Sequence, residues 1–305
     1  MSGYLLRRVI QALVVIFVVS GLVFFASHML GDPAALMAPV GASRQQVAEI
    51  SHQMGFDRPL LVQYGDFLGA ALRGDLGVSL RHDQPAMTLI LETLPNTLQL
   101  AVVAQLLALL LAIPAGIFAA TRRNSAFDGL TMAGAVLGQS VPSFWLGLML
   151  IVVVGVNLRL LPVSGMGDWR HLILPAVTLS MYPMARTARL VRSGMLEVLG
   201  QEYITTARAK GLAERVVLAR HALKNALIPV ITMVSLDFGT LLGGAVVTET
   251  IFAWPGLGRL IITAINTRDF PLIQASVIVV AVVFVVINLL VDVAYVYLDP
   301  RVEYA

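Results

Sequence analysis

The stretch TLPNTLQLAVVAQLLALLLAIPAGIFAAT, Thr93–Thr121, contains no aspartate, glutamate, lysine or arginine. A helix needs about 20 apolar residues to cross the roughly 30 Å hydrocarbon core of a bilayer. This uncharged run therefore predicts a membrane-spanning helix. A strand of a membrane barrel would instead alternate apolar and polar residues over about ten positions.

Five further stretches share this lack of charge on either side of the first. With it they make six spans, Val9–Gly31, Thr93–Thr121, Gly129–Leu158, His171–Ala185, Asn225–Leu236 and Phe270–Val291. The fifth continues past Asp237 to Thr248, and the short fourth reaches Leu190 if Arg186 and Arg189 lie at the interface. We predict an all-α membrane protein with six transmembrane helices.

The composition agrees with this interpretation. Of the 305 residues, 58% are hydrophobic and only 13% are charged, with a mean hydropathy of +0.83. Soluble domains carry about 25% charged residues. The absence of cysteine excludes disulfides, thiolate metal sites and cysteine nucleophiles. The net charge of +3 indicates basic cytoplasmic loops rather than a nucleic-acid partner.

The first span and the basic residues set the expected topology. Arg7 and Arg8 precede the span as in a signal peptide, but its length and the lack of a small-x-small cleavage site before Asp32 predict a retained helix. With the N-terminus inside, thirteen of the 21 lysines and arginines lie inside and eight outside. The positive-inside rule then places both termini in the cytoplasm.

Three segments are expected along the chain. Residues 1–31 form the N-terminus and first span, 32–92 an external helical loop, and 93–305 the core of five spans. In the external loop, Ser43–Gln46 fits a capping box and Pro59 suits the first turn of a second helix. The loop is predicted to be a small helical region.

A cytoplasmic loop at about 193–224 is the most informative region outside the spans. From Gly200 it reads GQEYITTARAKGLAERVVLARHALKNALIPV, which predicts a helix, a break at Gly211 and an amphipathic helix from Leu212. A basic helix–glycine–helix can dock into a groove of a soluble partner, although a solvated charged loop is the alternative. Small residues favour docking because they permit close approach. They are Thr205, Thr206, Ala207, Ala209 and Gly211.

The loop resembles the EAA loop of ABC importer permeases, in its dipeptide/oligopeptide/nickel branch, from Glu202-Tyr203 through Ala207–Gly211 to Arg220–Pro229. Further matching stretches cover nearly the whole chain. They are Gly31–Pro33, Phe56–Leu60, Gly74–Gly77, Leu94–Thr97, Leu161-Pro162 and Glu249–Gly258. The large first external loop resembles the first, B-type permease of such systems.

The resemblance implies the type I permease fold in a bacterial or archaeal inner (cytoplasmic) membrane. It also implies a second permease subunit in a heterodimer, two ATPase subunits and an external substrate-binding protein. ATP and Mg would bind the ATPases, with no cofactor on this chain. The chain is expected not to be an enzyme, since it lacks G-x-x-x-x-G-K-[ST].

The coupling contact to the ATPase would be made by one group of loop residues. They are Glu202, Tyr203, Thr205, Thr206, Ala207, Arg208, Lys210, Gly211, Leu212 and Arg220. Two positions depart from the general importer pattern: Thr205 replaces its acidic residue, and Lys224 replaces a proline that here comes five residues later. Both departures are typical of the peptide branch, and Glu202 is a candidate for the missing carboxylate contact.

Asp237 lies about twelve residues into the fifth span, near the bilayer centre. A carboxylate there needs water or a partner. It either lines the pathway and contacts the amino terminus of a passing peptide, or pairs with the second permease, or is protonated within the bundle. Gln139, Ser140 and Ser143, beside Pro142, face the pathway or make helix–helix contacts. Prolines 142 and 175 are expected to kink or break their helices.

Glu249, Phe252 and Trp254 are expected at the external end of the fifth span. This apolar turn is either a re-entrant gate or an interfacial anchor, a role in which tryptophan is common. The histidines show no metal-ligand spacing, so no metal site is expected.

The sequence thus predicts a permease subunit of an ATP-driven importer of di- and oligopeptides. Nickel, glutathione or another small solute remains the alternative within the same family. An ion-coupled secondary transporter would be expected to carry more intramembrane ionisable residues and often a repeat. An intramembrane hydrolase is not supported, because the predicted spans contain no constellation of catalytic residues.

Overall fold

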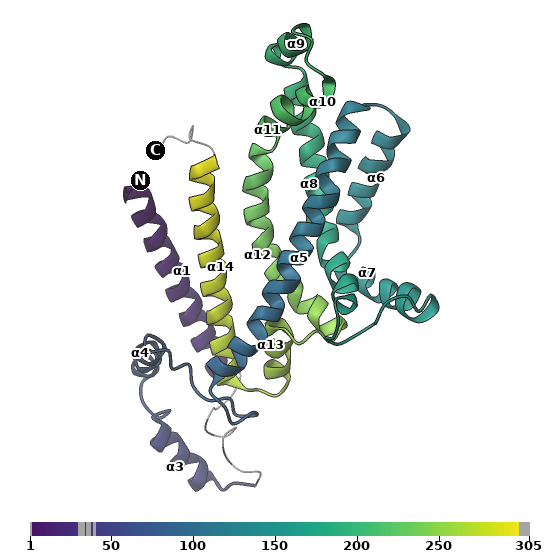
Figure 1. Cartoon of the computed structure of the whole chain (residues 1–305). Coiled ribbons are helices and arrows are strands. Elements are labelled where there is room, and N and C mark those ends of the chain that lie inside the picture. Colours follow the sequence, from purple (N-terminus) through teal and green to yellow (C-terminus); the bar gives the residue numbers. More distant parts are fainter. Residues whose placement is uncertain (1, 30–33, 35–37, 39–40, 299–305) are drawn as a thin grey trace. The chain divides into compact units, whose positions relative to one another are not determined.

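The structure is a computed structural model that describes residues 2–29, 34, 38 and 41–298. Within these ranges the regular elements are helices, and the only strand-like pairing is an isolated bridge between Val78 and Pro85 (Figure 1). The predicted all-α class is confirmed. The chain divides into two compact units, each of which is described by itself.

The first unit contains the chain up to Pro95 together with Gly256–Val286. Its elements, wholly or in part, are α1 (Ser2–Met29), α3 (Arg44–Met54), α4 (Leu60–Ala71), α5 (Ala86–Thr121), α13 (Leu257–Asn266) and α14 (Phe270–Leu298). An apolar cluster joins α5, α13 and α14 through residues such as Ile90, Leu257 and Leu272.

The two helices expected in the loop after the first span form as the sequence predicts. Ser43 caps α3 in a reciprocal capping box with Gln46, and α4 begins directly after Pro59. Tyr64 of α4 is buried, and its hydroxyl lies 2.8 Å from Ser20 Oγ of α1. The loop therefore packs its second helix onto the first span.

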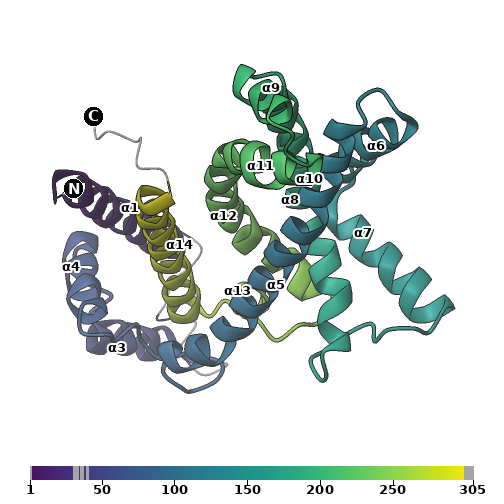
Figure 2. The same cartoon turned by 45° about the horizontal axis from the view of Figure 1, so that its top comes forward.

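The second unit contains Asn96–Pro255 and resumes at Ile287. Besides the rest of α5 and α14, its elements are α6 (Ala126–Ser140), α7 (Ser143–Leu150), the π-helix η1 (Ile151–Asn157), α8 (Arg170–Leu199), α9 (Glu202–Ala209), α10 (Glu214–Val216), the π-helix η2 (Val217–Ala222), α11 (Leu223–Ala226) and α12 (Ile228–Ile251). Helix α8 is central, because it packs against α6, α7 and α12. Figure 2 shows α9, α10 and α11 together at one end of this unit.

Among the described residues, four helices are long and apolar enough to cross a membrane: α1, α5, α12 and α14. A fifth span results if α6 and the α7–η1 pair count as one. The expected fourth span lies in α8, which carries Arg186, Arg189 and Arg192 and is less apolar than the others. The chain is thus a multi-pass membrane protein.

The span expected over Gly129–Leu158 is interrupted by a sharp bend. The axis bends by 104° between α6 and α7, and Val141 there is extended. Pro142 causes this, because it lacks an amide hydrogen and disfavours helical geometry in the preceding residue. The break predicted at Pro142 is confirmed, whereas α8 continues through Pro175 without a break.

Candidate functional site

The expected coupling loop is a helix–glycine–helix. Helix α9 ends at Ala209, and Gly211 follows with φ +80°, a left-handed conformation that side chains with a Cβ rarely adopt. Apart from Gly211 itself and its two chain neighbours, no residue has an atom within 4 Å of the position that a Cβ would take there. The backbone conformation, not lack of space, therefore requires the glycine. The break and the first helix are confirmed, whereas the second helix begins at Glu214, after Leu212, and its middle part is the π-helix η2.

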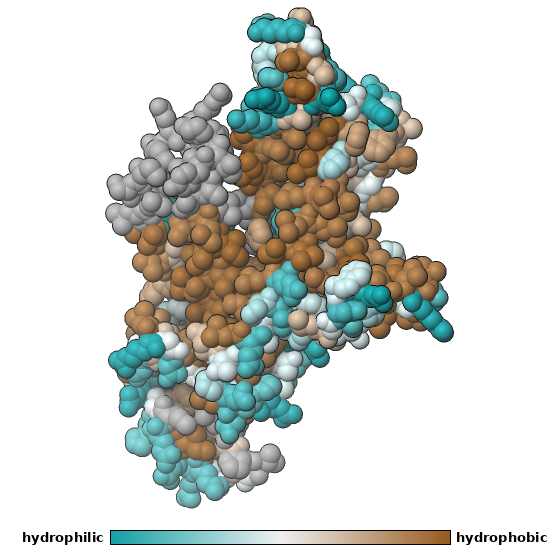
Figure 3. All heavy atoms as spheres, in the orientation of Figure 1, coloured by the Kyte–Doolittle hydropathy of each residue, from teal (hydrophilic) through white to brown (hydrophobic). Residues whose placement is uncertain are grey.

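Residues 200–226, called here the coupling segment, pack onto the second unit through two buried side chains of α9. Ile204 and Ala207 join an apolar cluster that includes Val191, Met195 and Val217. The other predicted coupling residues are exposed. They are Glu202, Tyr203, Thr205, Thr206, Arg208, Lys210, Gly211, Leu212 and Arg220. Figure 3 shows hydrophilic residues around this end of the unit and apolar residues over the helices that lead to it.

This burial corrects one expectation about the small residues of α9. Ala207 is only 7% exposed and contacts the chain's own core. It therefore fixes α9 to the membrane helices instead of offering room to a partner. Thr205 and Thr206 point outward and keep that possibility.

Two polar contacts hold α9 against the helix that follows. Arg208 donates to Glu214 through Nε at 3.1 Å and Nη2 at 2.6 Å, and Asn225 Nδ2 donates to the Tyr203 hydroxyl at 2.7 Å. The hydrogen bond from Arg208 lowers the pKa of Glu214 below its ordinary value. Both contacts bridge the turn at Gly211, so they fix the angle between its two arms.

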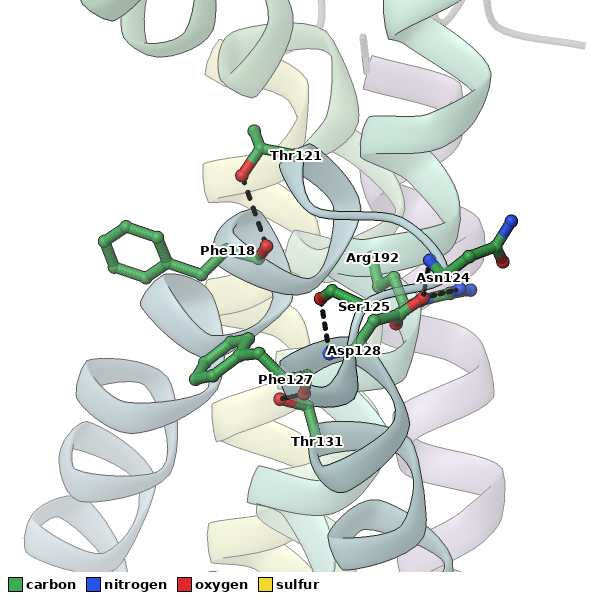
Figure 4. Close-up of polar contacts among 8 residues, drawn as sticks. All are labelled: Phe118, Thr121, Asn124, Ser125, Phe127, Asp128, Thr131 and Arg192. Atoms are coloured by element: carbon green, nitrogen blue, oxygen red, sulfur yellow. Dashed lines mark hydrogen bonds and ion pairs between the residues drawn. The ribbon is translucent and has the colours of Figure 1, made fainter.

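A second ion pair, which the sequence did not indicate, links α8 to α6 near the start of the coupling segment (Figure 4). Arg192 of α8 donates to both carboxylate oxygens of Asp128, at 2.5 and 2.7 Å. Asp128 is 4% exposed and also accepts from the backbone amide of Asn124. Ser125 caps α6 by accepting from the Asp128 amide. The Ser125-x-x-Asp128 spacing is a helix-start pattern, so it signals the cap of α6 but not the partner Arg192.

Two of the pathway candidates line one cavity of about 300 Å³ in the second unit. It lies where the α6–α7 break meets α8 and α12, and its polar lining comes from Gln139, Ser143, Thr178, Tyr182 and Thr240. The Gln139 Nε2 atom is buried without a hydrogen bond. Ser140 does not line this cavity, and its hydroxyl donates to the backbone of α6.

Asp237 is fully buried in α12, and its charged neighbour belongs to the same chain. Arg186 Nη2 of α8 lies 3.5 Å from Asp237 Oδ1 and donates to Met233 Sδ at 3.3 Å. Neither Asp237 oxygen accepts a hydrogen bond. The sequence alone suggested a membrane-interface position for Arg186 and did not indicate this pairing with Asp237.

The expected gate residues lie in a tightly bonded turn after α12. Phe252 and Trp254 are 1% and 2% exposed, and Glu249 is fully buried. Thr97 Oγ1 donates to Glu249 at 2.6 Å, and Trp254 Nε1 donates to the Asn96 carbonyl at 3.0 Å. So buried a tryptophan does not fit the interfacial-anchor alternative. The motifs Leu94–Thr97 and Glu249–Gly258 are thus joined in space.

In the described part of the chain, no cluster of three or more histidine, aspartate or glutamate side chains is arranged to hold a metal ion.

Two family models match the chain. "Binding-protein-dependent transport system inner membrane component" covers residues 112–304, and the model of the corresponding N-terminal region covers 1–101. The chain is 42% identical to the dipeptide transport system permease protein DppB of Alkalihalophilus pseudofirmus. It is also 42% identical to the glutathione transport system permease protein GsiC of Escherichia coli K12. Both alignments cover 100% of each chain.

Solved structures confirm the fold. The inward-facing MetNI methionine ABC transporter matches with a TM-score of 0.60 at 18% identity, over 70% of this chain and 97% of the other. An amino acid ABC transporter with histidines matches with a TM-score of 0.51 at 16% identity, over 70% and 94%. These structural similarities show that the chain has the type I permease fold, and nothing more. Taken with the family models and the full-length relatives, they show that this chain is an inner-membrane permease of the binding-protein-dependent transport system family.

Proposed function

We propose that the chain is the permease subunit of an ATP-driven importer of short peptides. One observation carries this function: the chain aligns over its full length, at 42% identity, with permeases named for dipeptide and for glutathione. Glutathione is itself a tripeptide, so both names describe small peptidic solutes. Glutathione is the second candidate substrate, because its permease is equally similar.

The coupling segment supports an ATP-driven mechanism. Its exposed face includes Thr206, Lys210 and Leu212, while Ile204 anchors it to the membrane helices. A groove on an ATPase subunit that binds this face would move α9 and α8 together as the ATPases open and close. Differential binding to two packed states is the general basis of such rigid-body switching.

The remaining partners follow from the same proposal. A second permease subunit would complete the pathway in a heterodimer, and an external binding protein would deliver the peptide. Two ATPase subunits would bind ATP and Mg, and this chain would hydrolyse nothing. Gln139 and Ser143 would line the pathway through their shared cavity. Glu249, Phe252 and Trp254 would close its external end.

Uptake in a strain that lacks only this gene tests the substrate. Labelled dipeptide, a longer peptide, glutathione and nickel ion are compared, with the wild-type gene returned on a plasmid as control. Loss of dipeptide or glutathione uptake that the plasmid restores is the expected result. Unchanged uptake of all peptides, with loss of nickel alone, would overturn the peptide assignment.

A further inference from the structure

Helix α8 carries two arginines that contact buried aspartates in different ways. Arg192 and Asp128 form two hydrogen bonds of 2.5 and 2.7 Å. Arg186 and Asp237 approach only to 3.5 Å and form none. The two arginines are six residues apart on one helix. We call the Arg192–Asp128 pair closed, because it is hydrogen-bonded, and the Arg186–Asp237 pair loose, because it is not.

The loose pair leaves several buried polar atoms without hydrogen bonds. Both oxygens of Asp237 and the Nε atom of Arg186 are among them. A buried ion pair is favourable only when its remaining lone pairs and protons are also satisfied. The pair therefore lacks hydrogen-bond partners of a kind that a further charged or strongly polar group could supply.

The pair lies next to the cavity already described. Pro183 of α8 and Thr240 of α12 line that cavity, and each is three residues from its charged neighbour, Arg186 or Asp237. Three residues correspond to about 4.5 Å along a helix. Because α8 leads toward the coupling segment and α12 leads away from it, both charges lie on the coupling-segment side of the cavity.

We propose that Arg186 and Asp237, which lie beside this cavity and do not line it here, bind the two termini of a short unblocked peptide once α8 and α12 have separated. The inference rests on the proposed function and names the feature of the peptide that is recognised. The guanidinium receives the terminal carboxylate, and the carboxylate receives the terminal ammonium. One loose ion pair is thereby exchanged for two closer ones. The site and the zwitterion are each neutral overall, so no net charge enters the low-dielectric interior.

The dimensions favour the smallest peptides. A volume of about 300 Å³ lies at the lower end of the roughly 300–1,000 Å³ typical of small-molecule sites. An extended dipeptide spans at most about 7 Å. It reaches both charges after a small separation of the pair, whereas a longer extended peptide reaches only one. The site therefore selects dipeptides over longer chains.

Access to the pair depends on the helices that carry it. Asp237 is fully buried here, so α8 and α12 must separate before a peptide reaches it. These helices run directly into and out of the coupling segment. Movement of that segment by the ATPases would open the pair, which links peptide binding to the nucleotide cycle.

The test uses the complete transporter in liposomes, with the binding protein and labelled dialanine outside. The variants are Arg186→Gln, Asp237→Asn and the double change. Asp128→Asn, Arg192→Gln and their double change serve as the matched pair. The maximal uptake rate, the dipeptide carried per ATP and the half-saturating concentration of binding protein are measured, and assembly is checked by copurification.

Each single change at Arg186 or Asp237 is expected to lower maximal uptake about tenfold, as loss of one charge-assisted hydrogen bond would. The half-saturating concentration of binding protein should not change, because docking is external. The double variant should be no better than the worse single one. At Asp128 and Arg192 the double variant should recover, since removal of both partners leaves no uncompensated charge.

Recovery of uptake in the Arg186/Asp237 double variant would make that pair structural and overturn the proposal, as would full uptake in both single variants. If the neutral variants fail to assemble, the charge-conserving variants Arg186→Lys and Asp237→Glu are tested instead. Unchanged uptake in both of these variants would overturn the proposal. Failure of the wild-type transporter to carry any peptide would instead defeat the proposed function, and the inference with it.

Discussion

Arg208 and Glu214 face each other across Gly211 and share two hydrogen bonds, of 3.1 and 2.6 Å. The pair joins the two arms of the coupling segment. We expect Glu214→Arg, which sets two like charges together, to lower uptake per ATP several-fold while the ATPases stay bound. The charge swap Arg208→Glu/Glu214→Arg should restore it. Arg215→Gln, an exposed neighbour, is the control, and a swap that fails to recover would contradict a positioning role.

Gly211 gives a second prediction, from its φ of +80°. Valine in left-handed backbone costs roughly 1–2 kcal/mol, whereas asparagine tolerates it better. Gly211→Val should abolish uptake and release the ATPase subunits during purification, and Gly211→Asn should keep most of both. Equal behaviour of the two variants would show that side-chain size, not backbone conformation, matters there.

Substitutions at Ala207 and Thr206 are expected to affect different properties, the stability of the fold and the binding of the ATPase. Ala207 is buried, so Ala207→Glu places a charge in the core and should lower the free energy of unfolding by about 2 kcal/mol or more. Thr206 is exposed, so Thr206→Glu should leave stability unchanged and weaken only ATPase binding. Thermal unfolding of the purified chain, compared with ATPase copurification, checks both. Equal loss of stability in the two variants would contradict this orientation of α9.

Local chemistry explains which of these features the sequence could predict. Uncharged runs, the capping box at Ser43 and the glycine at 211 each act through neighbouring residues, so the pattern itself contains the cause. The helix break at Pro142 is of the same kind. The sharp bend there was not predictable, because its angle depends on packing against α8.

Pairings between distant segments were not predictable. Arg192 with Asp128 and Arg186 with Asp237 are 64 and 51 positions apart. Arg186 alone suggested a membrane-interface position, and Asp237 alone suggested only that a partner was needed. The inward orientation of Ala207 likewise depends on Val217 and Met195, which only the fold brings to it. Burial, more than residue type, separates anchors from docking residues.

The segment from α3 to α4 carries a pH-dependent contact. His52 Nδ1 lies 2.6 Å from Asp57 Oδ2, and this hydrogen bond raises the pKa of His52 above 6.5. A raised pKa means that the contact stabilises the loop below pH 6.5 and is lost as the pH rises through the folded value. Histidine-labelled NMR should show the His52 imidazole titrating above 6.5, and Asp57→Asn should return it toward that value. An unchanged titration in the variant would exclude this pairing.

Substitution of Trp254 tests whether this residue has a structural role or acts in gating. Its Nε1 donates to the Asn96 carbonyl, so Trp254→Phe removes this hydrogen bond and should lower the free energy of unfolding by about 1 kcal/mol. Trp145 is 48% exposed, so Trp145→Phe is the matched control and should be nearly neutral. Unfolding is followed by thermal melts of the purified complex, with uptake measured in parallel. If Trp254→Phe changes uptake while its melting temperature equals that of Trp145→Phe, the ring acts in gating. If the melting temperature falls while uptake per assembled complex stays normal, the ring has a structural role and holds α5 to the end of α12.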